Sequence, residues 1–433
     1  MRFAVLSSLA LQALLPGRTI AFVGLPQPRT RFGWLAVTND DGSSDNPTIV
    51  QDLKIEEVSP SSKISKQSSK PALTSVVLKI SYDGRCFSGW SAANDDPNNN
   101  NKTVAKDAPR SGRRRRNQGM HSLLSGRPRS VEGVLKSCFA KLYGNVDPQQ
   151  IVIEGVSRTD KGVHALSMVA LVYCLSPDLD LEMAQSARTI PGKRLPHPWN
   201  STDTSCFCTL PMDTTRLGYT INRMLPPDVA ILQVAEMPNV RASSSAETDL
   251  IPFHPTISSE SKTYQYHLAV APRPNPLTRR TSWYVGNHLD LDRLQQAAQL
   301  LQGNHDFGAF RGAARGSTDK RKYAAQSTTC HVMDVNVTVK ASDMWGAQMI
   351  DAPGSSQNII VTIRADRFLY KMIRFMVGAM VGVATGVMEL DDLQTMLDTQ
   401  DRVETQFKCA PPEGLFLTNV EFQEEIAWTT ANQ

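Results

Sequence analysis

The hydrophobic pattern of the chain alternates between strand-like and helix-like segments. Alternating or β-branched apolar residues predict strands at residues 76–82, 164–174, 229–234, 262–270, 333–339, 359–365 and 415–422. Apolar residues at helical spacing predict helices at residues 131–142, 217–224, 291–301, 368–385 and 391–397. Gly144 follows the first of these helices and is expected to end it.

The order of these segments predicts the fold class. Each half of the folded region reads as strand, helix, strand and strand, which favours an α+β protein with an antiparallel sheet. We place an N-terminal part at residues 74–250 and a C-terminal part at residues 251–423, followed by a tail at 424–433. Two stretches without periodicity, residues 92–129 and 177–212, are expected to be insertions.

The first 73 residues differ from the rest. Residues 1–39 contain no acidic residue, begin with a short apolar run and continue with Arg18, Arg29 and Arg31. They resemble a bipartite presequence of the kind that directs proteins to complex plastids; a mitochondrial presequence is the alternative, and a spurious start would leave the protein in the cytoplasm or nucleus. Residues 40–73 are rich in Ser, Asp, Lys and Pro and read as a disordered linker.

The composition and the net charge say less about function than the hydrophobic pattern says about the fold. The net charge of +4, from 46 basic and 42 acidic residues, is too small to imply a nucleic-acid partner. Residues 92–129 carry nine Lys and Arg against three Asp, and the run Arg113–Arg116 either contacts phosphate or is a solvated loop. The seven cysteines show no metal-ligand spacing and no secreted disulfide framework, so we interpret them mostly as reduced thiols.

Candidate chemistry lies in one charged loop, SRTDKGVHA, at residues 157–165. Asp160 stands between Arg158 and Lys161, a pattern typical of either a solvated turn or a site that keeps one carboxylate charged. Arg374 is unusual because it lies within an apolar helical segment, where a buried Arg needs a carboxylate partner. Asp160 is one candidate, and such a partner favours the charged carboxylate that a nucleophile or base requires.

Seven segments together resemble the tRNA pseudouridine synthase A family. They occur in the family's order and cover residues 75–422 apart from the insertions. The segments are YDGRCFSGW, SRTDKGVHA, MLPPDVAILQVAEMP, SKTYQY, GNHDFGAFR, RFLYKMIRFMVGAMVGVATG and APPEGLFL.

The resemblance implies a fold, a reaction and a partner. The fold is the pseudouridine synthase fold, with two similar subdomains that share an antiparallel sheet flanked by helices and an active-site cleft between them. The reaction is the isomerisation of uridine to pseudouridine in the anticodon arm of tRNA, without a metal or an organic cofactor. The protein is expected to act as a homodimer, away from membranes. The target base has to leave the stack to be reached.

The resemblance also implies roles for particular residues. Asp160 is the nucleophile, Tyr264 is the active-site tyrosine that supports the flipped base, and Arg374 pairs with Asp160. The substrate-binding positions are Arg158, Thr159, Lys161, Gly162, Lys262 and Tyr266. Among them, Arg158 helps to extrude the base, and Thr159 and Gly162 shape the loop.

The sequence departs from the family at two points and leaves other functions open. Pro255-Thr256 replaces the family's Ala-Arg after Phe-His, and Ser91 replaces its Gln after Gly-Trp. The alternatives are a synthase acting on other tRNA positions or other RNAs, and a catalytically silent RNA-binding protein or tRNA chaperone on the same fold. A glycoside hydrolase requires a second carboxylate of suitable context, which does not accompany Asp160.

Overall fold

The computed structural model describes residues 18–23, 34–39, 73–91, 130–178, 198, 204–238, 240–241, 250–251, 253–313, 326–340, 357–402 and 407–431. The chain divides into two units, Met1–Lys70 and Pro71–Gln433. In the first unit, β1 (Arg18–Val23) and β2 (Trp34–Asn39) form an antiparallel pair. Both strands lie in the predicted presequence, whose targeting role stays a prediction. The linker at 40–72, the insertion at 92–129 with Arg113–Arg116, and most of the insertion at 177–212 lie outside the described residues.

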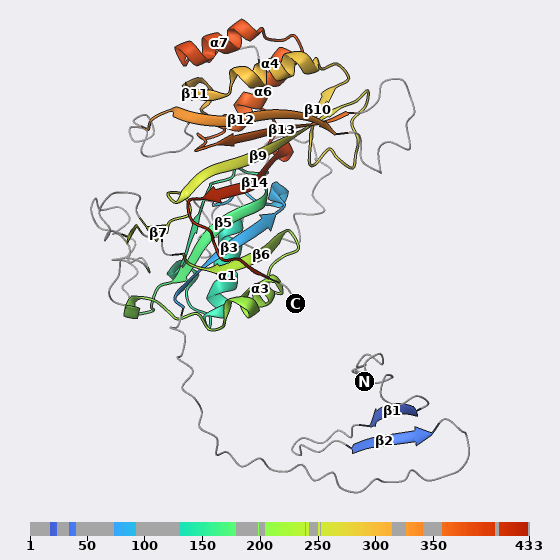
Figure 1. The fold of residues 1–433 in the computed structure, drawn as a ribbon, viewed down its shortest axis with the longest axis vertical. Helices are drawn as coiled ribbons and strands as arrows, with labels where there is room; N and C mark the ends of the chain where they lie inside the picture. The colour runs from blue at the N-terminus through green and yellow to red at the C-terminus, as the bar shows by residue number, and fades with distance from the viewer. Residues whose placement is uncertain are drawn as a thin grey trace, which may run out of the picture. The chain divides into compact units, whose positions relative to one another are not determined.

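The unit Pro71–Gln433 is organised around one 11-stranded sheet (Figure 1). Its strands run in the order β11-β12-β13-β9-β14-β5-β3-β6-β15, with β10 beside β9 and β4 beside β5. The strands of the N-terminal part are β3 (Ser75–Tyr82), β4 (Ile151–Gly155), β5 (His164–Cys174) and β6 (Val229–Glu236). Those of the C-terminal part are β9 (Ser259–Val270), β10 (Trp283–Gly286), β11 (Gly303–Asp306), β12 (Thr329–Lys340), β13 (Gln357–Ala365) and β14 (Leu415–Phe422).

The α+β class is confirmed, but the sheet is mixed rather than antiparallel throughout. β14 pairs with β5 in parallel, through Phe416–His164 and Leu417–Ala165, and β10 pairs with β9 in parallel. Parallel neighbours need a long crossover connection, which a pattern of local segments does not reveal. β14 therefore returns from the C-terminal part to the middle of the sheet and joins β9 to β5.

Two further short pairings involve residues for which no strand was predicted. β15 (Thr429–Thr430), inside the segment predicted to be a tail, pairs with β6 of the N-terminal part. β7 (Val240–Arg241) pairs with β8 (Leu250–Ile251).

Helices gather at both ends of the sheet (Figure 1). α1 (Val131–Leu142) and α3 (Thr214–Asn222) accompany the N-terminal strands, whereas α4 (Leu291–Leu300), α6 (Met372–Ala384) and α7 (Leu390–Thr399) lie at the β11–β13 end. Local sequence signals start three of these helices, because side chains of Ser130, Asp213 and Asp290 accept hydrogen bonds from free backbone N–H groups of the first turn.

α6 begins four residues later than the apolar pattern predicts. Its N-cap, Lys371, has a φ of 61°, in the left-handed region, so the helix starts only at Met372. Residues 368–369 are irregular and residues 370–371 form a turn instead, and Phe368 lies against Tyr264. Because α6 is apolar around nearly all its faces, it is buried between the sheet and neighbouring segments.

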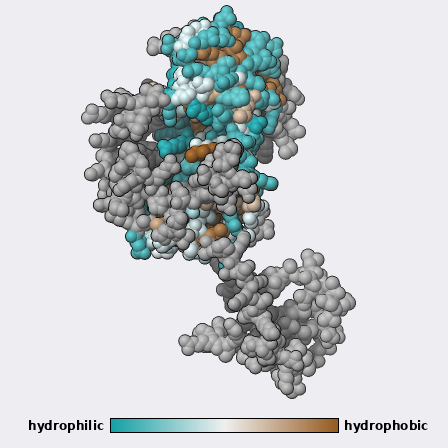
Figure 2. Space-filling model, turned by 60° about the vertical axis from the view of Figure 1, so that its left-hand side comes forward, coloured by the Kyte–Doolittle hydropathy of each residue, from teal (hydrophilic) through white to brown (hydrophobic). Residues whose placement is uncertain are grey.

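One face of the molecule is mainly polar where its residues are described (Figure 2). Figure 2 shows hydrophilic residues predominating on one face, with hydrophobic areas between them. The large hydrophobic side chains that are most exposed, Ile257, Leu277 and Val387, come from separate parts of the chain. Within the described ranges, no helix is both long and apolar enough to cross a bilayer.

Gly378 provides a test of the packing of α6. A Cβ at this position would lie 2.1 Å from the backbone oxygen of Lys408, so the helix approaches segment 407–410 at a distance that only glycine permits. Gly→Ala inside a helix usually stabilises a protein by about 1 kcal/mol. We expect Gly378→Ala to lower the free energy of unfolding instead, by about 1–3 kcal/mol, because the segments must separate. Urea unfolding measures the change, and a gain in stability would contradict this packing.

Candidate active site

The charged loop lies at the centre of the sheet. It connects β4 to β5, which pair with one another, and its last residues lead into the strand that meets β14. Leu417 of β14 is the register partner of both Ala165 on β5 and Tyr264 on β9. Residues paired directly across neighbouring strands point to the same face, so Tyr264 and Ala165 share one face of the sheet.

An ion pair joins the loop to α6. Arg374 Nη1 donates to Asp160 Oδ2 at 3.0 Å, and the side chains of Arg374 and Asp160 are 12% and 17% exposed. The two residues are 214 positions apart, so only the tertiary fold brings them together. Asp160 was the expected partner of Arg374, and among the described contacts neither Arg158 nor Lys161 forms an ion pair with Asp160.

Arg374 is held in place by the chain beyond α7. Its Nε donates to the backbone oxygen of Ala410 at 2.8 Å, and Ala410 N donates to the backbone oxygen of Arg374 at 2.9 Å. The guanidinium group is therefore fixed at two points, on a carbonyl oxygen and on the carboxylate of Asp160. A buried Arg is tolerated under these conditions, whereas removal of its partner would leave an uncompensated charge.

Tyr264 borders the same site. The ring is 5% exposed, its hydroxyl lies 2.9 Å from Ser157 Oγ, and it meets Phe368 edge-on at 5.2 Å. Burial raises the pKa of Tyr264 to about 12; the Ser157 hydrogen bond opposes this shift and the negative charge of Asp160 adds to it. The hydroxyl is consequently protonated near neutral pH. Ser157 and Phe368 were not singled out in the sequence, since nothing local distinguishes them.

The segment YDGRCFSGW, residues 82–90, contacts the backbone and side chains of the loop. We refer to it as the supporting segment. The Tyr82 hydroxyl lies 2.7 Å from Thr159 Oγ1, and Trp90 N donates to the backbone oxygen of Thr159. Gly89 forms a β-bridge with Asp160, at a φ of 121° that favours glycine. The backbone of Asp160 is thus fixed by a segment about 70 residues away in the sequence.

The remaining predicted substrate-binding residues fall into different environments. Thr159 is buried by Tyr82, and Gly162 has a φ of 82°, so both shape the loop. Arg158 and Lys161 are exposed beside Asp160. Lys262 is 6% exposed; burial lowers its pKa, against the opposing charge of Asp366.

A substrate-binding role of Tyr266 stays a prediction, and the structure shows this residue packed against neighbouring chain. Its side chain is fully buried, its hydroxyl donates to the backbone oxygen of Pro411 at 2.6 Å, and its ring meets Trp283 edge-on. A β-strand places Tyr264 and Tyr266 on the same face, but that period alone does not show which of the two is covered by neighbouring chain. Tyr266 is a packing residue that holds the segment after Ala410.

Thr256 stands where the resemblance implies an Arg, and its side chain contacts the backbone just before the loop. Its hydroxyl lies 3.1 Å from the backbone oxygen of Gly155 and 3.4 Å from that of Val156. The side chain satisfies backbone acceptors that the loop exposes where β4 ends. At this position, where the resemblance implies an Arg, the short Thr256 side chain contacts the protein's own backbone.

Comparisons with known proteins identify the family. The family model described as tRNA pseudouridine synthase matches residues 297–423. A tRNA pseudouridine synthase A of Syntrophotalea carbinolica is 30% identical over 68% of this chain and 87% of its own length. The tRNA pseudouridine synthase A 2 of Clostridium tetani is 24% identical over 79% of this chain and 96% of its own length, and a tRNA pseudouridine synthase A of Chlamydia trachomatis is 26% identical over 82% and 94%.

The mixed sheet, the ordered sequence segments and the matched relatives define an RNA-modifying isomerase of the pseudouridine synthase class. More narrowly, the chain belongs to the tRNA pseudouridine synthase A family. Within the described ranges, no group of three His, Cys, Asp or Glu residues is placed to hold a metal ion.

The raised pKa of Tyr264 has a measurable consequence for stability. The pKa of Tyr264 is 10.0 in the unfolded chain and about 12 in the folded protein. The protonated hydroxyl therefore contributes its full share to the unfolding free energy below pH 10, and this contribution is lost as the pH rises through 12. We expect Tyr264→Phe to reduce the fall in unfolding free energy between about pH 9 and pH 11.5 by roughly 2 kcal/mol. Chemical denaturation at each pH measures this fall. Tyr219→Phe, at an exposed tyrosine, is the control, and equal slopes in the two variants would contradict the burial of the Tyr264 hydroxyl.

Proposed function

We propose that this protein isomerises uridine to pseudouridine in the anticodon arm of tRNA and that Asp160 is the nucleophile. The observation that carries the proposal is the Asp160–Arg374 ion pair, which sets a partly exposed carboxylate beside Tyr264 where β9, β14 and β5 meet. A charged carboxylate is the form that attacks an electrophilic carbon. Membership of the family supports this assignment.

The proposed reaction conserves all atoms of the uridine. The Asp160 carboxylate bonds to C1′ as the bond between N1 and C1′ breaks and the base leaves with the electron pair. The base then turns, C5 bonds to C1′, and the bond between Asp160 and C1′ breaks, which restores the carboxylate. The proton on C5 leaves and N1 takes up a proton, so neither an oxidant nor a reductant takes part. Arg374 orients the carboxylate for the attack, while its second hydrogen bond, to the backbone oxygen of Ala410, holds the guanidinium group in place.

In this proposal Tyr264 has the role that the resemblance implies, which is support of the displaced base. Its raised pKa means that the hydroxyl is a hydrogen-bond donor at neutral pH, so it does not rest as a base. The ring lies on the face of the sheet that carries the loop and is oriented by Phe368 and Ser157. Support of the displaced base by this ring is the role that these contacts favour.

Recognition of RNA is assigned to the exposed cations Arg158 and Lys161 and to the buried cation Lys262. Arg158 and Lys161 flank Asp160 and face solvent, where phosphate groups are accessible to them. Lys262 lies two residues before Tyr264 on the same face of β9, and its side chain is buried. Its lowered pKa reflects burial, which an approaching phosphate would offset.

Asp160→Asn tests the nucleophile. The amide keeps the shape of the side chain but does not form the adduct, so release of tritium from C5-labelled uridine in tRNA should fall by several orders of magnitude while tRNA binding is retained. Asp213→Asn is the matched control, because it makes the same exchange at the exposed cap of α3. Activity of Asp160→Asn within about tenfold of the wild type would reject Asp160 as nucleophile.

The target position is tested separately by mapping pseudouridine along tRNA after carbodiimide labelling. We expect modification in the anticodon arm and its loss when the uridines of that arm are replaced by cytidine. Modification elsewhere in tRNA would refute the position but keep the chemistry. Binding without tritium release from any uridine would identify a silent RNA-binding protein instead.

Two further proposals concern assembly and destination. We propose a homodimer, as the family resemblance implies, and a plastid location directed by residues 1–39, with the mitochondrion as the alternative. Light scattering of the purified protein at micromolar concentration measures the assembly, and a monomer mass would refute the dimer. A reporter fused to residues 1–39 measures the destination, and a cytoplasmic reporter would refute the targeting role.

A further inference from the structure

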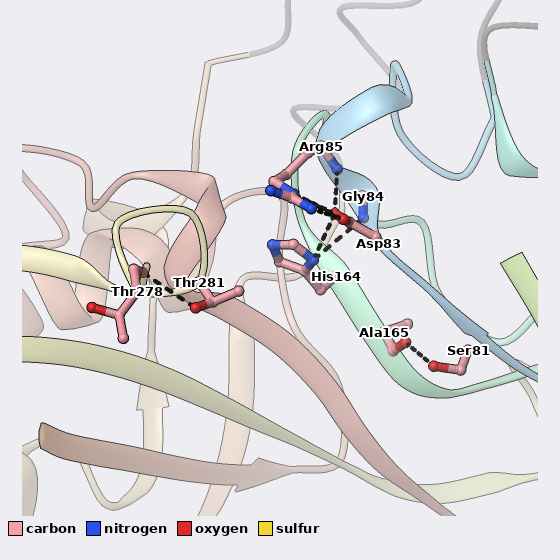
Figure 3. A network of polar contacts seen from close by, with 8 residues as sticks. All are labelled: Ser81, Asp83, Gly84, Arg85, His164, Ala165, Thr278 and Thr281. Atoms are coloured by element: carbon pink, nitrogen blue, oxygen red, sulfur yellow. Dashed lines mark hydrogen bonds and ion pairs between the residues drawn. The ribbon is translucent and has the colours of Figure 1, made fainter. Parts of the chain in front are cut away.

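His164 is a buried, titratable residue that the proposed reaction does not use. It follows the loop of Asp160 directly, begins β5 and is 3% exposed. Its Nδ1 lies 3.3 Å from Asp83 Oδ1 and 3.4 Å from the backbone N of Gly84 (Figure 3). Both partners belong to the supporting segment, so the imidazole connects that segment to the end of the loop.

Asp83 is itself held in a fixed orientation. Its carboxylate accepts hydrogen bonds from the backbone N of Arg85 at 3.1 Å and from Arg85 Nε at 2.8 Å, and Arg85 Nη2 adds a further short contact (Figure 3). Burial opposes the charge on Asp83, but the contacts with His164 and Arg85 outweigh it and hold its pKa well below the usual range. Asp83 therefore presents one carboxylate to both neighbours.

The turn after Asp83 also touches the loop backbone. A Cβ at Gly84 would lie 1.9 Å from the backbone oxygen of Val163, so the two segments are in direct contact. On the loop side, Val163 N donates to the backbone oxygen of Asp160 at 3.1 Å, which closes the turn that carries the carboxylate. A displacement of His164 or Val163 is therefore transmitted to Asp160 through three residues of tightly bonded backbone.

On its other side, His164 is braced by aromatic rings. Its ring stacks on Phe416 at 4.6 Å, and Phe416 also stacks on His267 at 4.6 Å. These residues come from β5, β14 and β9, which are neighbours in that order, so the rings form a row across the centre of the sheet. His164 precedes Ala165, which shares a face with Tyr264, so His164 points to the opposite face and does not reach the substrate.

We propose that Asp83 and His164 are positioning residues, which fix the backbone of the catalytic loop so that Asp160 reaches the nucleotide in the attacking geometry. The inference rests on the proposed function, because it assigns a role relative to Asp160 as nucleophile. A shift of about 1 Å in a reacting group is enough to cost on the order of a hundredfold in rate. The Asp83–His164 contact acts from the back of the sheet, so it affects the chemical step and leaves the RNA-binding surface unchanged.

Single-turnover kinetics with saturating enzyme and C5-tritiated tRNA test the proposal. Asp83→Asn removes the charge at constant size, and His164→Phe keeps the stacking on Phe416 but removes Nδ1. We expect each variant to slow tritium release about 10- to 100-fold while the dissociation constant for tRNA stays within about twofold of the wild type. If both act through one contact, the double variant is no slower than the slower single variant.

The control separates positioning from general destabilisation. Asp213→Ala removes the cap of α3 and lowers the melting temperature without touching the loop, so its single-turnover rate should equal that of the wild type. The proposal is overturned if Asp83→Asn matches this control, if weaker tRNA binding accounts for the whole loss, or if the two single effects add in the double variant. Should His164→Phe not fold, Asp83→Asn alone decides. The Asp160→Asn variant distinguishes failure of this proposal from failure of the proposed function. An active Asp160→Asn variant would refute Asp160 as the nucleophile. An inactive Asp160→Asn variant together with a fully active Asp83→Asn variant would refute only the positioning role of Asp83 and His164.

Discussion

The Asp160–Arg374 ion pair is the interaction on which the arrangement of the site depends. A carboxylate in a partly buried loop and a guanidinium group in an apolar helix are each unfavourable alone, and each compensates the other. The pair also requires α6 to lie against the segment around Ala410, which Gly378 permits by close approach to Lys408. The geometry of the helix, the C-terminal segment and the loop is therefore determined jointly.

The parallel pairing of β14 with β5 holds the residues next to the Asp160–Arg374 ion pair in place. Through it, a strand from the C-terminal part contacts the residues that follow Asp160, and the rings of His164, Phe416 and His267 extend the contact across three strands. Tyr264 and the loop occupy one face at this junction, and the stacked rings occupy the other. The site is thus built where the two parts of the sheet meet, and its reactive loop is supported from both parts.

Much of the fold follows from local signals. β5 and β14 occupy the residues that the apolar pattern predicts, because both are continuous runs of strand-forming residues with clear ends. The start of α6 was misplaced because the apolar run extends past the left-handed Lys371, whose conformation depends on packing. β15 was missed because two residues carry no periodic signal, and the parallel pairing was missed because strand order is a long-range property.

The family, the α+β class, the candidate loop and the expectation that Arg374 needs an acidic partner follow from the sequence alone, because ordered motifs and a charge in an apolar helical segment are visible without coordinates. The packing of Tyr266, the position of Tyr264 beside the loop, its contacts with Ser157 and Phe368, and the contact between Asp83 and His164 are known from the folded chain. A strand shows which side chains share a face, but which of them stay accessible depends on segments that arrive from distant parts of the chain.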